Sequence, residues 1–142
     1  MDRPVGLREL HVLIIDDDLD CLEMLATMLS SRGALVSHAS SARAALEMLR
    51  RIRPNLIVSD IGMPREDGVW FIRQFEKLAL AGPKVPVIAL TAFDSMRQHA
   101  RVAGFDAVLM KPLDPAAFYG ALRMLGLAVG ETEPLPERRL AA

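Results

Sequence analysis

The run Leu56–Ser59 constrains this chain most, because it is apolar on both faces and ends directly at a single carboxylate, Asp60. Such a strand fits the middle of a parallel sheet that is covered on both sides. Gly62, Pro64 and Gly68 follow and turn the chain. We therefore expect Asp60 at the carboxyl end of a buried strand, where open α/β sheets bind their ligands.

Strands and helices alternate along the rest of the chain. We expect strands at residues 10–15, 35–38, 56–59, 85–90 and 107–110. We expect helices from about 19 to 32, from a cap at Ser41 to Pro54, and at about 67–81, 94–103 and 114–125. This alternation predicts an α/β protein with a doubly wound five-stranded parallel sheet and five helices.

The domain boundaries follow from the same pattern. At 142 residues the chain fits one domain with a two-sided core. Residues 1–9 show no clear period and are expected to be an N-terminal lead-in, and 10–125 the domain itself. Residues 126–142 contain prolines and mixed charges, which predicts a flexible tail or the stub of a linker.

Polar side chains stand at the carboxyl ends of four of the five expected strands. They are Asp16 with Asp17, then Asp60, Thr91 and Lys111. A single Asp after a strand is ordinarily a turn former or a helix N-cap. The coincidence of four such ends at one edge favours a shared site instead.

The chemistry of that site follows from the residue types. Neighbouring carboxylates raise each other's pKa unless a cation lies between them, and Mg²⁺ prefers a few carboxylates with several waters. Asp60 can then act as the nucleophile that forms an aspartyl-phosphate. Lys111 would place a positive charge opposite the metal, and the Thr91 hydroxyl would donate to a phosphoryl oxygen.

The residues at these strand ends, in their order and spacing, resemble the receiver domain of two-component response regulators. The matching motifs are Asp16-Asp17, Asp60-x-x-Met63-Pro64 with Asp67-Gly68, Thr91-Ala92 and Lys111-Pro112. The resemblance covers residues 10–125 and is highly specific. It implies the flavodoxin-like fold with strand order 2-1-3-4-5.

The resemblance also implies a function. Asp60 would accept a phosphoryl group from a histidine kinase or a histidine phosphotransfer protein, with Mg²⁺, or Mn²⁺ in its place, as cofactor. Asp17 would bind the metal directly with Asp60, Gly62 through its backbone carbonyl, and Asp16 through water. The domain would be a phosphoacceptor with self-phosphorylation and self-dephosphorylation activity rather than an enzyme, and phosphorylation would change its binding of a downstream protein.

Three residues around Thr91 and Lys111 shape the expected switch and the access to the site. Ala92 is small and would leave room for the phosphoryl group. Val108 stands where the family usually has Tyr or Phe, three residues before the lysine, so the usual inward swing of a ring with Thr91 is not available. Phe93 places an apolar ring at the mouth of the site, where it would hinder the attacking water.

Composition excludes several other classes. The net charge is −1 with no long basic run, so a nucleic-acid interface has no support. Apolar runs are far shorter than the ~18 residues of a membrane span, and residues 1–9, which Asp2 and Glu9 interrupt, are not expected to be a secretory signal. The single cysteine, Cys21, fits a reducing cytoplasm and is expected to fill the core. Dimerisation and the identity of the partners stay open.

Two alternatives use the same residues. A pseudo-receiver would keep the fold as an interaction module without phosphorylation, but the acidic pair, Asp60, Thr91 and Lys111 are all present. A haloacid-dehalogenase-type phosphatase could begin at Asp16-x-Asp18. That reading leaves Asp60 unexplained and finds no paired acids at a strand end after Lys111.

Overall fold

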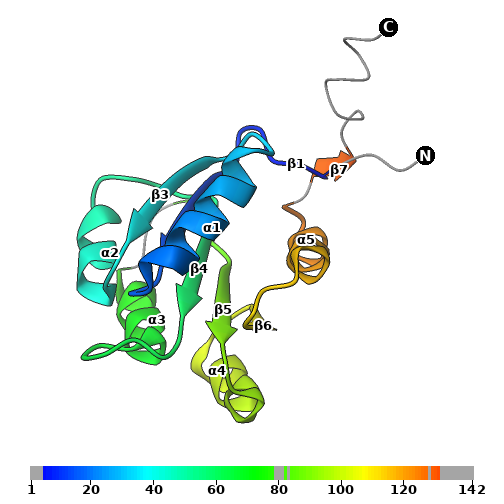
Figure 1. The fold of residues 1–142 in the computed structure, drawn as a ribbon. Helices are drawn as coiled ribbons and strands as arrows, with labels where there is room; N and C mark the ends of the chain where they lie inside the picture. Colours follow the sequence, from blue (N-terminus) through cyan, green and yellow to red (C-terminus); the bar gives the residue numbers. More distant parts are fainter. Residues whose placement is uncertain (1–4, 79–81, 83, 128, 132–142) are drawn as a thin grey trace, which may run out of the picture.

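A computed structural model describes residues 5–78, 82, 84–127 and 129–131. Its centre is a sheet in which every neighbouring pair of strands is parallel. The strands are β2 (His11–Ile15), β3 (Leu35–Ala39), β4 (Leu56–Asp60), β5 (Val87–Thr91) and β6 (Ala107–Met110), in the spatial order β3-β2-β4-β5-β6. Numbered along the chain within this sheet, the order is 2-1-3-4-5, so the predicted flavodoxin-like topology is confirmed (Figure 1).

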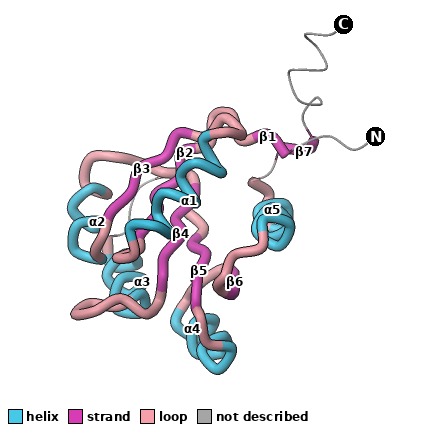
Figure 2. The backbone as a smooth tube through the Cα atoms, viewed as in Figure 1, coloured by secondary structure: helices cyan, strands magenta, loops and turns pink. Residues whose placement is uncertain are grey.

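Five α-helices connect these strands (Figure 2). They are α1 (Leu19–Ser30), α2 (Ala42–Met48), α3 (Gly68–Lys77), α4 (Arg97–Ala103), which follows the 3₁₀ turn η1 (Asp94–Met96), and α5 (Pro115–Met124). A side-chain oxygen caps the first turn of four of them, from Asp18, Ser41, Asp67 and Asp114. Within the described residues, no helix has the length and apolar character needed to cross a membrane.

Two helix ends differ from the expectation. α2 ends at Met48 rather than near Pro54, because the chain tightens there into shorter-range bonds such as the 3.2 Å bond from the Arg50 N–H to the Glu47 carbonyl. The expected end of the third helix near residue 81 lies outside the described residues.

The alternation of side chains along the strands divides the core into two layers. One face of the sheet packs against α1 and α5, through residues such as Ile14, Val58 and Phe118. The other face packs against α2, α3 and α4, through residues such as Leu13, Ile57 and Phe71. The central strands β4 and β5 are buried along their whole length, as the apolar run before Asp60 predicts.

A second, two-stranded sheet was not expected from the sequence. β1 (Val5–Gly6) pairs antiparallel with β7 (Val129–Glu131), at the end of the molecule away from the arrowheads of β4 and β5 (Figure 1). Leu7 follows β1 and is fully buried in the layer under α1 and α5. Residues 5–7 are therefore held against the domain, and the boundaries placed at residues 9 and 126 stay predictions.

Candidate phosphoacceptor site

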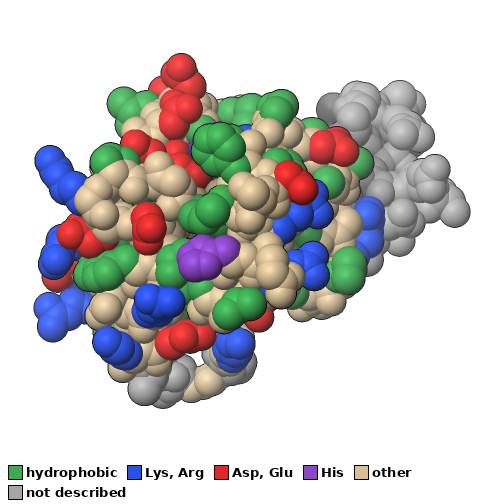
Figure 3. Space-filling model, turned by 90° about the horizontal axis from the view of Figure 1, so that it is seen from below, with side chains coloured by type: hydrophobic (Ala, Val, Ile, Leu, Met, Phe, Trp, Pro, Cys, Tyr) green, Lys and Arg blue, Asp and Glu red, His purple; other side chains and the backbone are tan. Residues whose placement is uncertain are grey.

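The carboxyl ends of the parallel strands bring the expected polar residues to one edge of the sheet. Asp16 follows β2, Asp60 ends β4, Thr91 ends β5 and Lys111 follows β6. Figure 3 views the molecule from this edge. Three of these side chains are almost fully enclosed, with exposed fractions of 0% for Asp16, 8% for Asp60 and 3% for Thr91. Buried polar groups at a sheet edge mark a built site rather than a solvated turn.

Lys111 joins the two buried carboxylates. Its Nζ donates to Asp16 Oδ2 at 2.9 Å and lies 3.4 Å from Asp60 Oδ1. A backbone hydrogen bond holds Lys111 in this position. The Lys111 N–H donates to the Thr91 carbonyl at 2.8 Å, which fixes the backbone of the lysine beside the end of β5. The Asp60 carboxylate also accepts a longer bond, 3.4 Å, from the Gly62 N–H.

The charges at this edge are incompletely balanced. Burial raises the pKa of the Asp60 carboxyl, the nearby charge of Asp16 raises it further, and Lys111 and the Gly62 N–H only partly oppose this. Burial by itself would lower the pKa of Lys111, but the hydrogen bond to Asp16 and the charges of Asp60 and Asp16 together raise it. The ammonium is therefore held charged, while the ionised form of Asp60 is disfavoured.

Asp17 completes an acidic cluster. One carboxylate oxygen from each of Asp16, Asp17 and Asp60 lies within 4.8 Å of the others. Asp17 is exposed, so the cluster opens to solvent on its side. Among the described residues, Lys111 is the one cation that pairs with this cluster, so two negative charges remain, and a hard divalent ion with oxygen ligands fits this donor set. Gly62 lies exposed beside the cluster at the start of the loop after β4.

Thr91 points into the following loop in this structure. Its Oγ1 accepts a hydrogen bond from the Phe93 N–H at 3.1 Å and lies 3.4 Å from the Phe93 carbonyl oxygen. Ala92 and Phe93 are both exposed, with 67% of Phe93 accessible to solvent. The threonine hydroxyl therefore has the Phe93 carbonyl oxygen as its acceptor, and donating to a group on Asp60 requires its hydrogen to turn away from that oxygen.

Val108 lies inside the core. It is 6% exposed and belongs to the layer formed with α2, α3 and α4. A branched side chain of this size has no ring that could move between a surface and a buried position.

Two residues near the cluster, Asp18 and Cys21, have structural rather than chemical roles. Asp18 caps α1 by accepting from the Asp20 N–H at 3.0 Å, so its oxygen serves the helix start. Cys21 is half-buried beside Asp16, and burial first, then the hydrogen bond with Asp16, raises the pKa of its thiol to about 12. A thiol with that pKa is a poor nucleophile.

One contact at the site was not anticipated. Gly68, in the first turn of α3, packs directly on the backbone carbonyl of Asp60. The Asp67-Gly68 pair marks this position in the sequence, but nothing in the local pattern says what the glycine touches.

Fold and site together define a flavodoxin-like α/β protein with an acidic cluster, a hydroxyl and a lysine at the carboxyl edge of its sheet. The response regulator receiver domain family matches residues 12–123. The chain therefore belongs to this family, whose members are phosphoacceptors rather than true enzymes.

Curated relatives agree with this assignment. The chain is 41% identical over 111 residues to an uncharacterized 14.6 kDa protein in the sodA1 3′ region of Leptolyngbya boryana, covering 77% of this chain and 84% of that protein. It is 42% identical over 98 residues to response regulator MprA of Mycobacterium leprae, covering 69% of this chain and 41% of MprA. The transcriptional regulatory protein GlrR of Escherichia coli K12 is 35% identical over 114 residues, 79% of this chain and 25% of GlrR. The chain thus spans less than half of these two regulators.

Solved structures show the same fold. The receiver domain of Francisella response regulator 1452 superposes with a TM-score of 0.74 at 25% identity, covering 82% of this chain and 96% of that one. The receiver domain of sensor histidine kinase PA1611 from Pseudomonas aeruginosa PAO1 has a TM-score of 0.72 at 28% identity, covering 82% of this chain and 98% of that one. A magnesium ion is coordinated in the active site cleft of the PA1611 domain.

Proposed function

We propose that this domain accepts a phosphoryl group on Asp60 from the phosphohistidine of a histidine kinase or histidine phosphotransfer protein. The observation that carries the proposal is the position of Lys111, whose ammonium lies 2.9 Å from Asp16 and 3.4 Å from Asp60. A lysine shared by a nucleophilic carboxylate and its acidic neighbour holds positive charge where an incoming phosphoryl group would develop negative charge.

In the transfer step, a carboxylate oxygen of Asp60 forms a bond to phosphorus while the bond from phosphorus to the donor imidazole nitrogen breaks. The imidazole leaves with the electron pair and takes a proton. Lys111 compensates the charge on the phosphoryl oxygens, and Thr91 donates its hydroxyl to one of them after leaving Phe93. Hydrolysis later restores the carboxylate, as water attacks phosphorus and inorganic phosphate leaves.

Mg²⁺ would be held by Asp17 and Asp60 directly, by the Gly62 carbonyl, and by Asp16 through water; Mn²⁺ offers the same charge. Its chemistry would be to neutralise the acids and polarise the phosphoryl oxygens. The acidic cluster supports this assignment, as does the magnesium ion in the PA1611 receiver domain.

A groove of about 530 Å³ beside the site supports the proposal that the phosphoryl donor is a protein. It lies between α1 and the segment that follows Lys111, and its lining is largely apolar, with Met24, Met28, Leu113 and Pro115. Met24 is 50% exposed, although burying an apolar methionine side chain lowers the free energy. We propose that the donor docks here in the cytoplasm, and that a downstream protein reads the phosphorylated form.

The test is incubation with Mg²⁺ and acetyl phosphate or phosphoramidate, followed by mapping of acid-labile phosphate. Label on Asp60 that is lost in Asp60→Asn supports the proposal. Label on Asp16 would instead indicate a phosphatase-type nucleophile. No label from either small donor, and none from a panel of histidine kinases, would indicate an interaction module without phosphorylation.

A further inference from the structure

We propose that the groove between α2 and α3 binds an acidic protein segment that anchors one large apolar side chain beside Trp70. The groove has a volume of about 390 Å³. Its lining includes Arg43 and Leu46 from α2, Arg50 from the turn after α2, and Trp70, Gln74 and Lys77 from α3. We call this surface the α2–α3 groove.

The groove arises from two helical stripes that face each other. On α2, Arg43 and Leu46 are three residues apart and so share one face, and Arg50 lies in the turn directly after the helix. On α3, Trp70, Gln74 and Lys77 have the same kind of spacing. The opposite faces of both helices are buried in the core, through residues such as Ala45 and Phe71. The stripes are therefore outward faces with apolar side chains among the charges.

Trp70 is prepared for contact at this surface. It is partly exposed, and the Arg43 guanidinium lies over its ring, 5.1 Å from the centroid. The same guanidinium also pairs with Glu66, with Arg43 Nε and Glu66 Oε1 3.1 Å apart. Trp and Arg are the residue types that contribute most to protein–protein binding, and here both are fixed in place before any partner arrives.

The charges of the groove select an acidic occupant. Glu47 only weakly holds Arg50, at 3.6 Å between two well-exposed groups. In the part of the chain that the structure describes, neither Arg73 nor Lys77 makes an ion pair. Arg73 and Lys77 also line a second hollow of about 500 Å³ beside Trp70, together with one acid, Glu76. A carboxylate in the groove or in this second hollow would meet a cation that makes no ion pair within the described residues.

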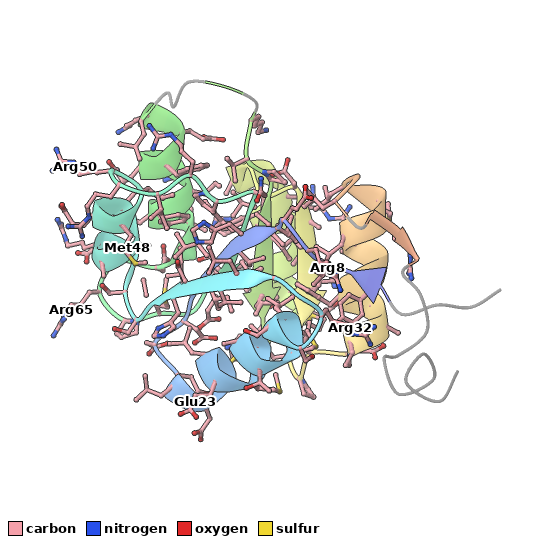
Figure 4. All side chains as sticks on the ribbon, turned by 90° about the horizontal axis from the view of Figure 1, so that it is seen from above. Arg8, Glu23, Arg32, Met48, Arg50 and Arg65 are labelled. Atoms are coloured by element: carbon pink, nitrogen blue, oxygen red, sulfur yellow. The ribbon has the colours of Figure 1, made fainter. Side chains whose placement is uncertain are left out.

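The rest of the molecule would steer such a segment toward this groove. Residues 16–30 contain five acids and no Lys or Arg, so the α1 side repels acidic chains. Arg50 and Arg65 extend outward on the α2 side, whereas Glu23 projects from α1 (Figure 4). Lys and Arg side chains gather at the same end in the space-filling view (Figure 3, left). Complementary charge would raise the association rate and fix the orientation of the partner.

A protein segment fits better than a nucleic acid. Glu47 and Glu66 stand among the cations and would repel phosphates, whereas nucleic-acid surfaces present continuous positive charge. The groove also holds one aromatic ring already covered by Arg43, which leaves no free stacking face on that side. Leu46 and Leu78 add apolar lining that suits a leucine or aromatic side chain.

The test is selection of random peptides of about twelve residues, displayed on phage, against the full chain. We expect enriched sequences with several Asp or Glu around one Trp, Phe or Leu. Their affinity, measured by fluorescence polarisation, should fall about tenfold or more in Lys77→Glu and in Trp70→Ala. It should also fall as salt rises from about 50 to about 300 mM. Arg123→Glu, on α5, makes the same change in charge and should leave the affinity within about twofold.

Several outcomes would overturn the proposal. These are the absence of enriched peptides, enrichment of basic or neutral peptides, and binding that Lys77→Glu does not weaken. Tighter binding of a single-stranded oligonucleotide would assign the groove to nucleic acid, and a dimer dissolved by Lys77→Glu would assign it to a second copy. Asp60→Asn should bind the peptides as wild type does, so this result is independent of phosphorylation.

Discussion

Gly68 lies against the backbone of Asp60 so closely that a Cβ built on the glycine would be 2.6 Å from the Asp60 carbonyl oxygen. The same Cβ would lie 2.8 Å from the Cα of Ile61. The Gly68 N–H donates to the Ile61 carbonyl at 3.0 Å, which joins the start of α3 to the end of β4. The position of the Asp60 backbone therefore depends on the missing side chain at residue 68.

Gly68→Ala should displace this backbone. We expect a loss of about 1–3 kcal/mol in the free energy of unfolding, because the clash is with backbone atoms that cannot rotate away. The phosphorylation rate of Asp60 should fall about tenfold or more, since the nucleophile moves from its partners. Urea denaturation and acetyl phosphate kinetics measure the two effects. Gly120→Ala, in α5 with nothing within 4 Å, is the matched control and should raise stability by up to about 1 kcal/mol. Equal stability of both variants would contradict the role of the contact.

Asp60→Asn should stabilise the protein in the absence of divalent ions. Burial and the charge of Asp16 raise the pKa of Asp60, so its ionised form costs free energy in the folded state at neutral pH. The neutral amide removes that cost, and we expect a gain of about 1–2 kcal/mol by thermal or urea unfolding in EDTA. A loss of stability in Asp60→Asn would show that neighbouring groups already balance the negative charge of the Asp60 carboxylate in the folded protein.

Adding Mg²⁺ should raise the melting temperature of the wild-type chain. At a Mg²⁺ concentration a hundred times the dissociation constant, the free energy of unfolding should rise by about 2.7 kcal/mol. Asp17→Asn removes the exposed acid of the cluster and should abolish most of this gain while leaving the EDTA stability nearly unchanged. If Mg²⁺ stabilised this variant as much as wild type, the ion would have to bind elsewhere.

Lys111→Met should damage both stability and function. It leaves Asp16, which is fully buried, without the ammonium at 2.9 Å, and we expect a loss of about 1–3 kcal/mol in EDTA. Phosphorylation by acetyl phosphate should slow by about a hundredfold. Lys84→Met is the control, because the Lys84 side chain is 74% exposed in its 3.6 Å ion pair with Asp106, and we expect stability to change by less than about 1 kcal/mol. Similar losses of stability in the two variants would show that the Lys111 contacts stabilise the protein no more than a surface ion pair does.

Most of the fold was predictable because the relevant signals are local. Apolar runs such as the one before Asp60, helix caps such as Ser41, and stops such as Gly33 place the central strands and the helix starts. The polar strand ends then meet because parallel strands share one carboxyl edge.

The features that the sequence did not predict depend on distant contacts. β1 and β7 pair although more than a hundred residues of chain separate them. With two and three residues, these strands are too short to show a hydrophobic pattern of their own. Gly68 is visible as a turn residue, but its contact with Asp60 depends on how α3 docks. The α2–α3 groove needs two stripes on separate helices, and only the packed structure aligns them.

Phe93→Ala should shorten the lifetime of phosphorylated Asp60. The sequence predicts this ring at the mouth of the site, where it would hinder the attacking water, and Phe93 donates its backbone N–H to Thr91. We expect hydrolysis to be roughly threefold faster, measured by loss of phosphate at neutral pH, with no change in stability because the ring is 67% exposed. Phe93→Leu keeps an apolar shield and should stay near wild type. Unchanged or slower hydrolysis in Phe93→Ala would show that the ring does not hinder the attacking water.

Signalling should rely on the backbone of residues 91–95 rather than on a rotating ring. Thr91 must turn its hydroxyl hydrogen away from the Phe93 carbonyl oxygen, 3.4 Å away, to donate to a phosphoryl oxygen, and Val108 has no ring to follow it inward. On phosphorylation, backbone NMR shifts should therefore concentrate in residues 91–95 and stay small in β6 and α5. Thr91→Val keeps the shape but loses the hydroxyl, so the loop shifts should largely disappear, whereas Thr91→Ser should retain them. Shifts across β6 and α5 as large as those in the loop would show that this domain transmits phosphorylation through its last strand and helix despite the valine.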